Sequence, residues 1–421
     1  MANKKKKVSC NFAKQNEAHH RNLFIQKLIE VAKAVSVNGA YKLLDPHLLN
    51  LIYFCRFHST HFISGDDGIN WNSQIAEIKE HLMDQLKNNN YFRFDLTGKE
   101  ISQYDLYGPG LSLWANLYNL VKTKNPLYAQ IGEAFKDFIE TDNIGEQILK
   151  AIYSVTNFHA LELSSLDKRI VSIKVEVMSR KDGNPYLHTQ AKITSYKPEI
   201  IEVTIDGNTR SAFRLGFSYN GSPLNWMDCS AHALGLNYLP EDAKIPVYLQ
   251  HHALNRLEER LDCFCNATRL FGLMNSVYKA KCIRYNGKLL LEYYYEDDKL
   301  GYLMIELVKG VAVVRTFLLL THNCTPESEM LNKIIGLEKQ DISFLNLDKL
   351  STFTHSDICE NTMLCDLFTR AGCKSLIDDG NKFLYKDKLI KNASAIESYF
   401  SKYQEYFKAL ELPEPEPESV G

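Results

Sequence analysis

The sequence lacks the features that would assign it to a membrane or to one of the large nucleotide-dependent or hydrolytic enzyme classes. Its apolar runs stay below the roughly 20 residues that a membrane-spanning helix needs, and the longest, "VAVVRTFLLL", contains Arg315. The first 15 residues are rich in lysine but have no apolar stretch like that of a secretion signal. No phosphate-binding loop, dinucleotide-binding glycine pattern or serine-hydrolase signature occurs. We therefore expect a cytoplasmic protein with no membrane partner.

An excess of charge of one sign is also missing, as are closely paired cysteines. The 49 Lys and Arg residues nearly balance the 51 Asp and Glu residues, so the net charge is only -2. A nucleic-acid site would therefore have to be a local patch. The ten cysteines lie in apolar runs without the C-x-x-C spacing of a zinc site. We expect reduced cysteines, no metal site and no cofactor.

With 421 residues, of which 45% are hydrophobic, the chain is long enough for two or three cores. Apolar residues recur at helical spacing up to Leu161. Alternation with a period of two then takes over, with turns expected at Asp182-Gly183-Asn184 and Asp206-Gly207-Asn208. The fold class that these patterns predict is α+β. The expected parts are a basic, solvated tail (1–15), a helical domain (16–162), a β-rich domain of two hairpins (163–243), an α+β domain (244–325), a mainly helical segment (326–411) and a Pro/Glu tail (412–421).

The most specific pattern lies in "VYLQHHALNRLEERLDCF", from Val247 to Phe264. At about 100° per residue, one sector of about 100° on this helix contains His252, Arg256, Glu259 and Arg260. The opposite, apolar side contains Leu254, Leu257, Leu261 and Phe264. On periodicity alone, an ordinary amphipathic surface helix explains this arrangement, with Arg256 and Glu259 as an i, i+3 ion pair.

The spacing H-A-x-x-R-x-x-E-R in "HALNRLEER" adds information beyond periodicity. The segment follows a short expected strand, "IPVYLQ", and precedes four expected strands: "SVYKAKCIRY" (Ser276 to Tyr285), "GKLLLEYYYED", "LGYLMIELVKG" and "GVAVVRTFLLLTHN". Over about residues 245–325 this combination resembles the small bacterial ribonuclease toxins of the RelE and BrnT kind. The resemblance implies a helix packed on a twisted antiparallel sheet. The matching residues are His252, Arg256, Glu259 and Arg260 in the helix signature and Thr316, in "VVRTF", at the late-strand position.

The same resemblance implies a metal-independent endoribonuclease of a toxin or defence type, in which the RNA 2'-hydroxyl attacks the adjacent phosphate. Such cleavage needs a base, a cation for the charge that develops on the phosphorane, and an acid for the leaving 5'-oxygen. His252 suits the base or the acid. Arg256 and Arg260 suit the phosphate, because a guanidinium fork fits two phosphate oxygens. Glu259 could orient an arginine or act as the base.

The strands after the helix add further candidates. Alternation along the last strand places Thr316 and His322 on one face, and His322, at the strand end, is a candidate catalytic residue. The tyrosines Tyr293, Tyr294 and Tyr295 could stack on RNA bases, although ordinary strand aromatics show the same pattern.

Two other functions fit the same helix. A non-catalytic, RelE-like binding module would use it to hold nucleic-acid phosphate or the carboxylates of a protein partner such as an antitoxin. A structural domain would use it for ion pairs with other domains. An enzyme needs His252, Arg256 and Arg260 exposed together in a concave site. A binding module needs them on an open surface beside other Lys or Arg residues, and a structural domain needs them buried in ion pairs.

Overall fold

The structure is a computed structural model that describes residues 2–36, 39–66, 69–88, 91–93, 99–123, 125–140, 144–179, 187–382 and 392–401. The chain divides into two compact units. Unit 1 consists of Met1–His159, Ser172–Ser195 and Tyr219–Pro223, and unit 2 of Ala160–Val171, Tyr196–Ser218 and Leu224–Gly421. In these described ranges, no helix combines the length and the apolar character that a bilayer crossing requires.

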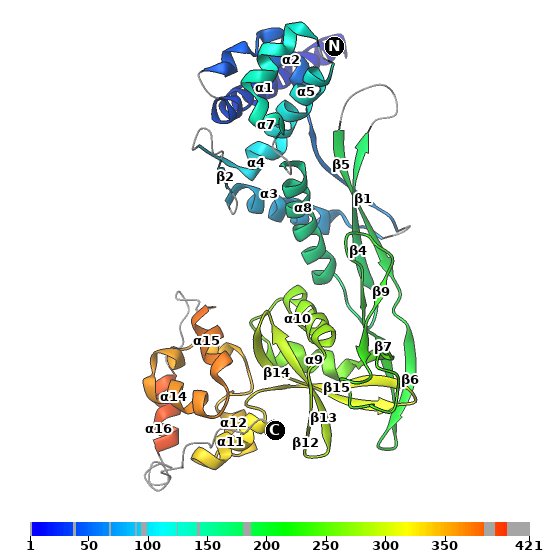
Figure 1. The fold of residues 1–421 in the computed structure, drawn as a ribbon, viewed down its shortest axis with the longest axis vertical. Helices are drawn as coiled ribbons and strands as arrows, with labels where there is room; N and C mark the ends of the chain where they lie inside the picture. Colours follow the sequence, from blue (N-terminus) through cyan, green and yellow to red (C-terminus); the bar gives the residue numbers. More distant parts are fainter. Residues whose placement is uncertain are drawn as a thin grey trace. The chain divides into compact units, whose positions relative to one another are not determined.

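Unit 1 is mainly helical (Figure 1). Its longer helices are α1 (Ala2–Val35), α2 (Pro46–Phe54), α3 (Asn72–Asn88), α5 (Leu111–Lys122), α6 (Ala129–Ala134), α7 (Lys136–Glu140) and most of α8 (Ile144–Glu162). Short helical turns are η1 (Ala40–Leu43), α4 (Gln103–Asp105), η2 (Leu106–Gly110) and η3 (Pro126–Tyr128). Helix α2 shows how the sequence starts a helix: Pro46 occupies its first turn, and the Asp45 side chain accepts the Leu48 N–H at 2.7 Å.

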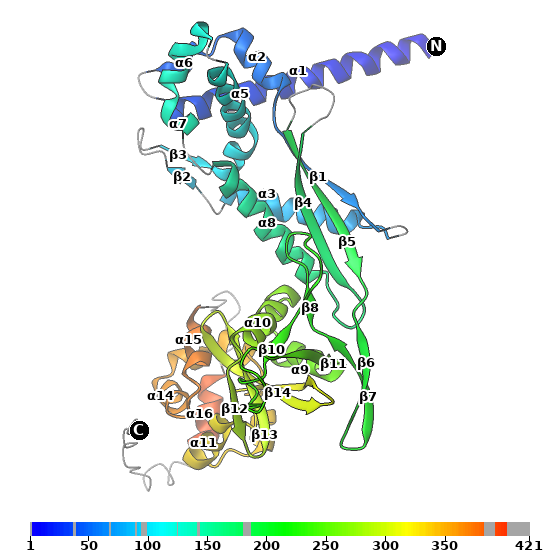
Figure 2. The same cartoon turned by 45° about the vertical axis from the view of Figure 1, so that its right-hand side comes forward.

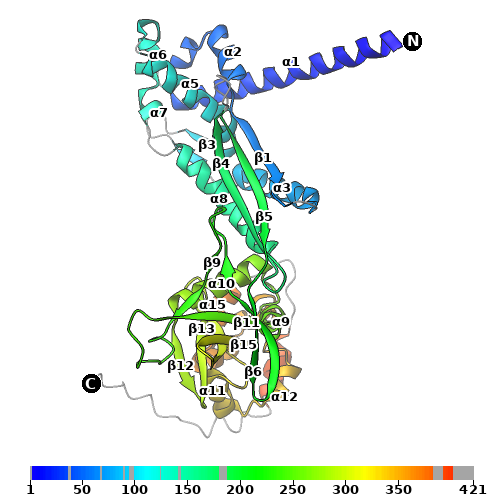
Figure 3. The same ribbon diagram turned by 90° about the vertical axis from the view of Figure 1, so that its right-hand side faces the viewer.

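The three-stranded sheet of unit 1 has the order β1-β5-β4. Its strands are β1 (His58–Ser64), β4 (Ile170–Ser179) and β5 (Leu187–Tyr196), and a separate hairpin is formed by β2 (Tyr91–Arg93) and β3 (Glu100–Ser102). β1 runs parallel to β5 (Figure 3). The hydroxyl of Thr60 lies 2.7 Å from the hydroxyls of both Thr189 and Tyr107. These buried hydrogen bonds join β1, β5 and η2.

Unit 2 is built on an eight-stranded sheet in the order β12-β13-β14-β15-β11-β7-β6, with β10 paired to the start of β11. Its strands are β6 (Ile200–Ile205), β7 (Asn208–Arg214), β10 (Asp228–Ser230), β11 (Lys244–Gln250), β12 (Cys282–Tyr285), β13 (Lys288–Tyr295), β14 (Asp298–Val308) and β15 (Val311–Leu319). A small pair is formed by β8 (Gly216–Phe217) and β9 (Asn225–Trp226). Because β11 is parallel to β15 and antiparallel to β7, the sheet is mixed.

Helices α9 (His251–Arg260) and α10 (Asn266–Lys279) follow β11, and α9 packs on β15 while α10 packs on β13 (Figure 2). The C-terminal helices are α11 (Pro326–Ile335), α12 (Lys339–Phe344), α13 (Ser351–Thr354), η4 (Asp357–Glu360), α14 (Thr362–Arg370), α15 (Lys374–Lys382) and α16 (Ala393–Ser401). On β11, Val247 and Leu249 belong to the large core shared with these helices, whereas Tyr248 belongs to a smaller cluster with Val313. Strand alternation therefore directs these neighbours to opposite faces of the sheet.

The predicted α+β class is confirmed. The helical N-terminal region, the short strand before the motif helix and the helices after Pro326 are also present. Asp206 and Gly207 have φ angles of 51° and 75° and form the turn of the β6–β7 hairpin, as the sequence indicated. The other expected turn, Asp182-Gly183-Asn184, and the Pro/Glu tail, 412–421, lie outside the described residues.

The two expected hairpins do not form one β-rich domain. β5 and most of β4 belong to unit 1, whereas β6 and β7 belong to unit 2. The reason is a pairing between segments far apart in sequence: β7 is hydrogen-bonded to β11 and so extends the sheet of unit 2. Alternation of side chains reveals a strand but does not reveal its neighbour, so this pairing could not be read from the sequence.

Two segments differ locally from the sequence expectations. The strand expected from Ser276 contains the end of α10, and β12 begins only at Cys282, after Ala280 ends the helix with a φ of 49°. The apolar residues Leu270, Leu273 and Val277 recur at helical spacing and are buried. The basic segment 1–15, expected as a solvated tail, belongs to α1 from Ala2 onward. No glycine or proline interrupts residues 2–35, so the helix has no local stop signal.

The close packing of α10 on β13 depends on Gly272. A Cβ atom at this position would lie 2.3 Å from the hydroxyl oxygen of Tyr293, which is fully buried.

In an exposed helix, Gly→Ala stabilises by about 1 kcal/mol. Here we expect Gly272→Ala to lower the free energy of unfolding by about 2 kcal/mol instead, because α10 must move away from the sheet. Urea unfolding measures the change. Tyr278→Ala, at an 82% exposed side chain of the same helix, is the control and should change stability by less than about 0.5 kcal/mol. A stabilised Gly272→Ala variant would contradict the close contact.

Candidate functional site

The motif residues lie on α9, directly after β11 (Figure 3). Ala253 and Leu257 are buried in the core, so the opposite side of the helix faces outward. His252 is exposed there, and the side chains of Arg256 and Glu259 are 40% and 54% exposed. Arg256 donates to the Glu259 carboxylate in the i, i+3 ion pair that the spacing suggested. We use the name α9 site for the set His252, Arg256, Glu259, Arg260, Thr316 and His322.

Arg260 is the one charged residue of the helix motif that is buried, with 6% of its surface exposed. The helical wheel placed it on the charged outer face. Instead, α9 ends at this residue and the side chain turns onto β15, where Nη1 donates to the Phe317 carbonyl oxygen. Its Nε is buried without a hydrogen-bond partner. Burial lowers the pKa of Arg260 to about 10, and Arg256 contributes to this shift, whereas Asp348 and Glu259 act in the opposite direction. The condition that an enzyme exposes Arg260 together with Arg256 is therefore not met.

Thr316 comes close to Arg260, because both side chains contact the same backbone oxygen. Thr316 is 9% exposed, and its Oγ1 donates to the Phe317 carbonyl oxygen at 3.4 Å. The structure thus brings together two positions, on α9 and on β15, that the motif resemblance had linked. The Thr316 hydroxyl is therefore bonded to the strand backbone, next to the guanidinium of Arg260.

His322 lies in the turn after β15, which ends at Leu319, and not on the strand face that alternation had indicated. Its backbone N–H donates to the Leu319 carbonyl oxygen at 2.8 Å. Its ring Nδ1 accepts the Cys324 backbone N–H at 3.3 Å. Because a backbone N–H can only donate, the neutral imidazole of His322 carries its hydrogen on Nε2. The fold therefore selects one of the two tautomers.

Both histidines of the α9 site are held in the neutral form. Burial is the main cause that lowers the pKa of His322 to about 3, and the positive charge of Arg260 adds to it. Partial burial, followed by the charge of Arg256, lowers the pKa of His252, whereas Glu259 acts in the opposite direction. The other cations that lower these two pKa values are Arg210 and Arg260 for His252, and Lys339, Arg256 and Lys288 for His322. At neutral pH, His322 is therefore a hydrogen-bond donor at Nε2, and His252 has a free basic nitrogen.

Three of these cations were not found by sequence reasoning. Arg210 lies on β7, Lys288 begins β13 and Lys339 begins α12, and all three are exposed. Lys288 Nζ lies 3.8 Å from Cys324 Sγ, beside the turn that holds His322. No spacing rule connects these positions with "HALNRLEER", since only the tertiary fold brings them near α9. Together with Arg256 they are the accessible cations whose charge lowers the pKa of His252 or His322, and we call these four the cation patch.

The tyrosines of β13 have other roles than the base stacking considered for them. Tyr293 is fully buried, and its hydroxyl donates to the Arg269 carbonyl oxygen at 3.0 Å, so it cannot stack on a base. Tyr294 donates to the Glu292 carboxylate at 2.5 Å, and the ring of Tyr295 packs on Phe264 with centroids 4.8 Å apart. Among the residues whose side chains are described, no three His, Cys, Asp or Glu side chains gather as they do in a metal site.

Stability measured as a function of pH tests the neutral state of His322. Below about pH 6.5 the unfolded chain binds a proton at this histidine, whereas the folded chain does so only near pH 3. The folded state should therefore lose up to about 1.4 kcal/mol per pH unit as the pH falls through this window. In His322→Asn, Oδ1 can still accept the Cys324 N–H but nothing titrates, so we expect a flatter profile between about pH 7 and about pH 5. Urea unfolding of both proteins measures the difference, and parallel profiles would contradict a buried neutral imidazole.

Comparisons with known proteins assign no family to this arrangement. A scan against protein-family models, a search of curated proteins and a search of solved structures each found no match. The likeness to toxins of the RelE and BrnT kind therefore rests only on "HALNRLEER" and the strand order.

Proposed function

We propose that the α9 site binds the phosphodiester backbone of RNA. The observation that carries this proposal is the burial of Arg260 without an ion pair in the described part of the chain, although Asp348 and Glu259 act on its pKa. Among the described residues of unit 2, every other largely buried arginine has a carboxylate nearby. These pairs are Arg214 with Glu199 and Asp228 at 3.4 and 3.0 Å, Arg269 with Glu258 at 3.9 Å, and Arg315 with Asp206 at 2.9 Å. Arg260 is more buried than these arginines, and in the described part of the chain it forms no ion pair.

An unpaired buried charge costs several kcal/mol of folding stability, so its presence calls for a compensating partner. The guanidinium of Arg260 would gain that partner from a bound anion. A phosphate fits, because a guanidinium donates charge-assisted hydrogen bonds to phosphate oxygens. Since Nε is buried and Nη1 donates to the Phe317 carbonyl oxygen, Nη2 is the nitrogen left for this contact. The neutral His322 adds a donor at Nε2 without adding a proton-dependent charge.

The surroundings of Arg260 favour a polymer of phosphates over a single small anion. Arg256, Arg210, Lys288 and Lys339 are accessible and belong to four separate elements. Cations spread over an open surface can contact successive phosphates of one strand, and they make binding strongly dependent on salt. The resemblance of the motif to ribonuclease toxins favours RNA as that strand. A protein partner with carboxylates in the same positions, as an antitoxin would have, could cover the patch.

Cleavage of the bound RNA is a second candidate function, and the accessibility of a neutral His252 beside Arg256 favours it. The free imidazole nitrogen would take the proton of a 2'-hydroxyl. The 2'-oxygen then bonds to phosphorus, and the bond to the 5'-oxygen breaks. Arg256 and the Nε2–H of His322 would stabilise the phosphorane oxygens. Glu259, already paired with Arg256, orients that arginine rather than serving as the base. The leaving 5'-oxygen takes its proton from solvent, and a 2',3'-cyclic phosphate remains.

Binding of a fluorescent single-stranded RNA, followed by anisotropy, tests the proposal. Arg260→Met should raise the Kd tenfold or more, which is about 1.4 kcal/mol. The same variant should unfold at an unchanged or higher urea concentration, because an apolar side chain replaces an unpaired buried charge. Arg256→Ala should also weaken binding, and it should lower the slope of log K against log salt by about one. Arg370→Ala, an exposed arginine on α14 with Asp366 at 3.8 Å, is the matched control. Unchanged affinity in both variants of the α9 site would remove RNA binding from it.

Incubation of total RNA with the protein in EDTA tests the cleavage. We expect products with 2',3'-cyclic phosphate ends. His252→Gln should slow their formation by about a hundredfold or more, because it removes the general base. RNA affinity in the same variant should stay within about threefold of the wild type, because His252 is neutral and contributes little charge. RNA that is bound but stays intact would leave unit 2 as a binding module.

A further inference from the structure

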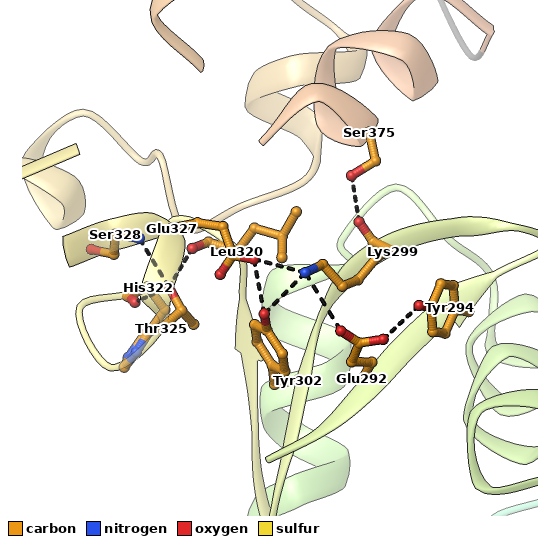
Figure 4. Close-up of polar contacts among 10 residues, drawn as sticks. All are labelled: Glu292, Tyr294, Lys299, Tyr302, Leu320, His322, Thr325, Glu327, Ser328 and Ser375. Atoms are coloured by element: carbon orange, nitrogen blue, oxygen red, sulfur yellow. Dashed lines mark hydrogen bonds and ion pairs between the residues drawn. The ribbon is translucent and has the colours of Figure 1, made fainter. Parts of the chain in front are cut away.

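A second polar network of unit 2 lies next to the turn that holds His322. We call Glu292, Lys299, Tyr302 and Glu327 the Lys299 network. Figure 4 shows Lys299 Nζ between the other three side chains, 2.8 Å from Glu327 Oε1, 3.0 Å from the Tyr302 hydroxyl and 3.7 Å from Glu292 Oε1. The Tyr302 hydroxyl also lies 2.8 Å from Glu327 Oε1. Lys299 and Tyr302 of β14 thus both contact the Glu327 carboxylate at the start of α11, and Glu292 of β13 contacts Lys299.

The hydrogen bonds and the burial of this network determine the protonation states of Lys299 and Tyr302. Burial alone lowers the pKa of Lys299, but its hydrogen bonds to Glu327 and Tyr302 outweigh that effect, so the pKa is raised overall. Burial raises the pKa of Tyr302 as well. Lys299 is therefore an ammonium and Tyr302 a phenol that donates to Glu327. The Glu327 side chain is 8% exposed, and its Oε2 is buried without a hydrogen-bond partner. A buried ion pair that leaves one oxygen unsatisfied is weak evidence for a purely stabilising role.

Thr325 connects the start of α11, which contains Glu327, with His322. Thr325 is the N-cap of α11, two residues before Glu327, and its Oγ1 accepts the Ser328 N–H at 3.2 Å. The backbone N–H of Thr325 donates to the His322 carbonyl oxygen at 2.9 Å, and the Thr325 hydroxyl lies 2.8 Å from the same oxygen. The Thr325 hydroxyl also bonds to the Leu320 carbonyl oxygen (Figure 4). The turn is thereby closed on itself between the end of β15 and the start of α11.

These contacts make Glu327 the outer anchor of the turn. At the other end, the Leu320 N–H donates to the Leu300 carbonyl oxygen at 3.1 Å, which fixes the turn to β14. Lys299 and Tyr302 belong to the same strand and hold Glu327. One strand therefore sets both ends of the turn.

We propose that Glu327, gripped by Lys299 and Tyr302, is a positioning residue that holds the His322 turn in the form in which Nδ1 accepts the Cys324 N–H and Nε2–H is free to donate to a phosphate. This inference rests on the proposed function of the α9 site. Glu327 contacts no ligand itself and acts through the turn. A simpler role also exists, since the Ser375 hydroxyl on α15 donates to the Lys299 carbonyl oxygen and the network could serve only to attach the C-terminal helices. The two roles differ in what happens to the imidazole of His322.

Nitrogen NMR of isotope-labelled histidine separates the two roles. In the wild type we expect one tautomer for His322, with Nδ1 as the acceptor nitrogen and Nε2 carrying hydrogen; the His322→Asn variant assigns its signals. In Lys299→Met and in the milder Tyr302→Phe, we expect the two tautomers to interconvert, because the turn is no longer anchored. Attachment of the helices alone would lower the unfolding midpoint of these variants and leave the His322 signals as they are, and that result would overturn the proposal.

A double-mutant cycle on RNA affinity provides the second measurement. Lys299→Met should raise the Kd for the fluorescent RNA about tenfold. The same change in an His322→Asn background should have almost no further effect, because the residue through which it acts is gone. Lys279→Met, which removes a lysine paired with Asp297 at 3.1 Å on the same unit, is the matched control and should leave both the Kd and the His322 signals unchanged. Additive losses would overturn positioning through His322. If the wild type binds no RNA, the proposed function fails, and the NMR result alone still decides whether the network sets the tautomer.

Discussion

The end of α9 is the point on which the candidate site of unit 2 depends, because Arg260 is held there from two sides. Its guanidinium donates to the Phe317 carbonyl oxygen on β15. Its own carbonyl oxygen accepts the Leu350 N–H at 2.7 Å, and the carboxylate of Asp262 accepts the Ser351 N–H at 2.9 Å. The helix, the sheet and the C-terminal segment therefore meet at this residue. The fold fixes the direction of the side chain, and the burial of its charge is a consequence of that direction.

The charge of Arg260 acts on both histidines of the α9 site, whose other surroundings differ. Burial is the main cause that lowers the pKa of both, and the charge of Arg260 adds to it, so neither imidazole adds to the positive charge of the patch at neutral pH. The Cys324 N–H then commits Nδ1 of His322 as an acceptor, which leaves this residue a donor only. His252 has no such constraint and stays exposed. The two histidines have the same side chain, but their surroundings make His322 a hydrogen-bond donor and leave His252 an accessible base.

Periodicity was enough to predict the α+β class, the two-sided helix α9 and the hairpin at Asp206-Gly207, because each depends on neighbours in sequence. It placed Arg260 outside, since a helical wheel assumes that the helix continues, whereas α9 stops there and frees the side chain to turn inward. It missed Lys288 and Lys339, which only the fold brings near α9. It also could not show that Tyr293 fills the space beneath Gly272, because both residues look ordinary within their own elements. The spacing therefore predicted α9 and its charged side, and the tertiary contacts determine the burial and the hydrogen bonds of each residue on it.

Two cations of unit 2, Lys299 on β14 and Arg260 at the end of α9, have different surroundings. The ammonium of Lys299 contacts the Glu327 carboxylate, the Tyr302 phenol and, more loosely, the Glu292 carboxylate. Its hydrogen bonds to Glu327 and Tyr302 raise its pKa. Arg260 is more deeply buried, and its guanidinium donates to a backbone carbonyl oxygen; burial lowers its pKa, and the charge of Asp348 only partly offsets this effect. The chain is thus able to pair a buried cation with a carboxylate, as it does at Lys299. Arg260, in contrast, has no ion pair in the described part of the chain. The accessible Arg256 and the Nε2–H of His322 belong to the same α9 site. Under the proposed function, an anion from outside the chain would complete such a site, and its binding would stabilise the folded protein through the interaction that Arg260 does not form within the chain.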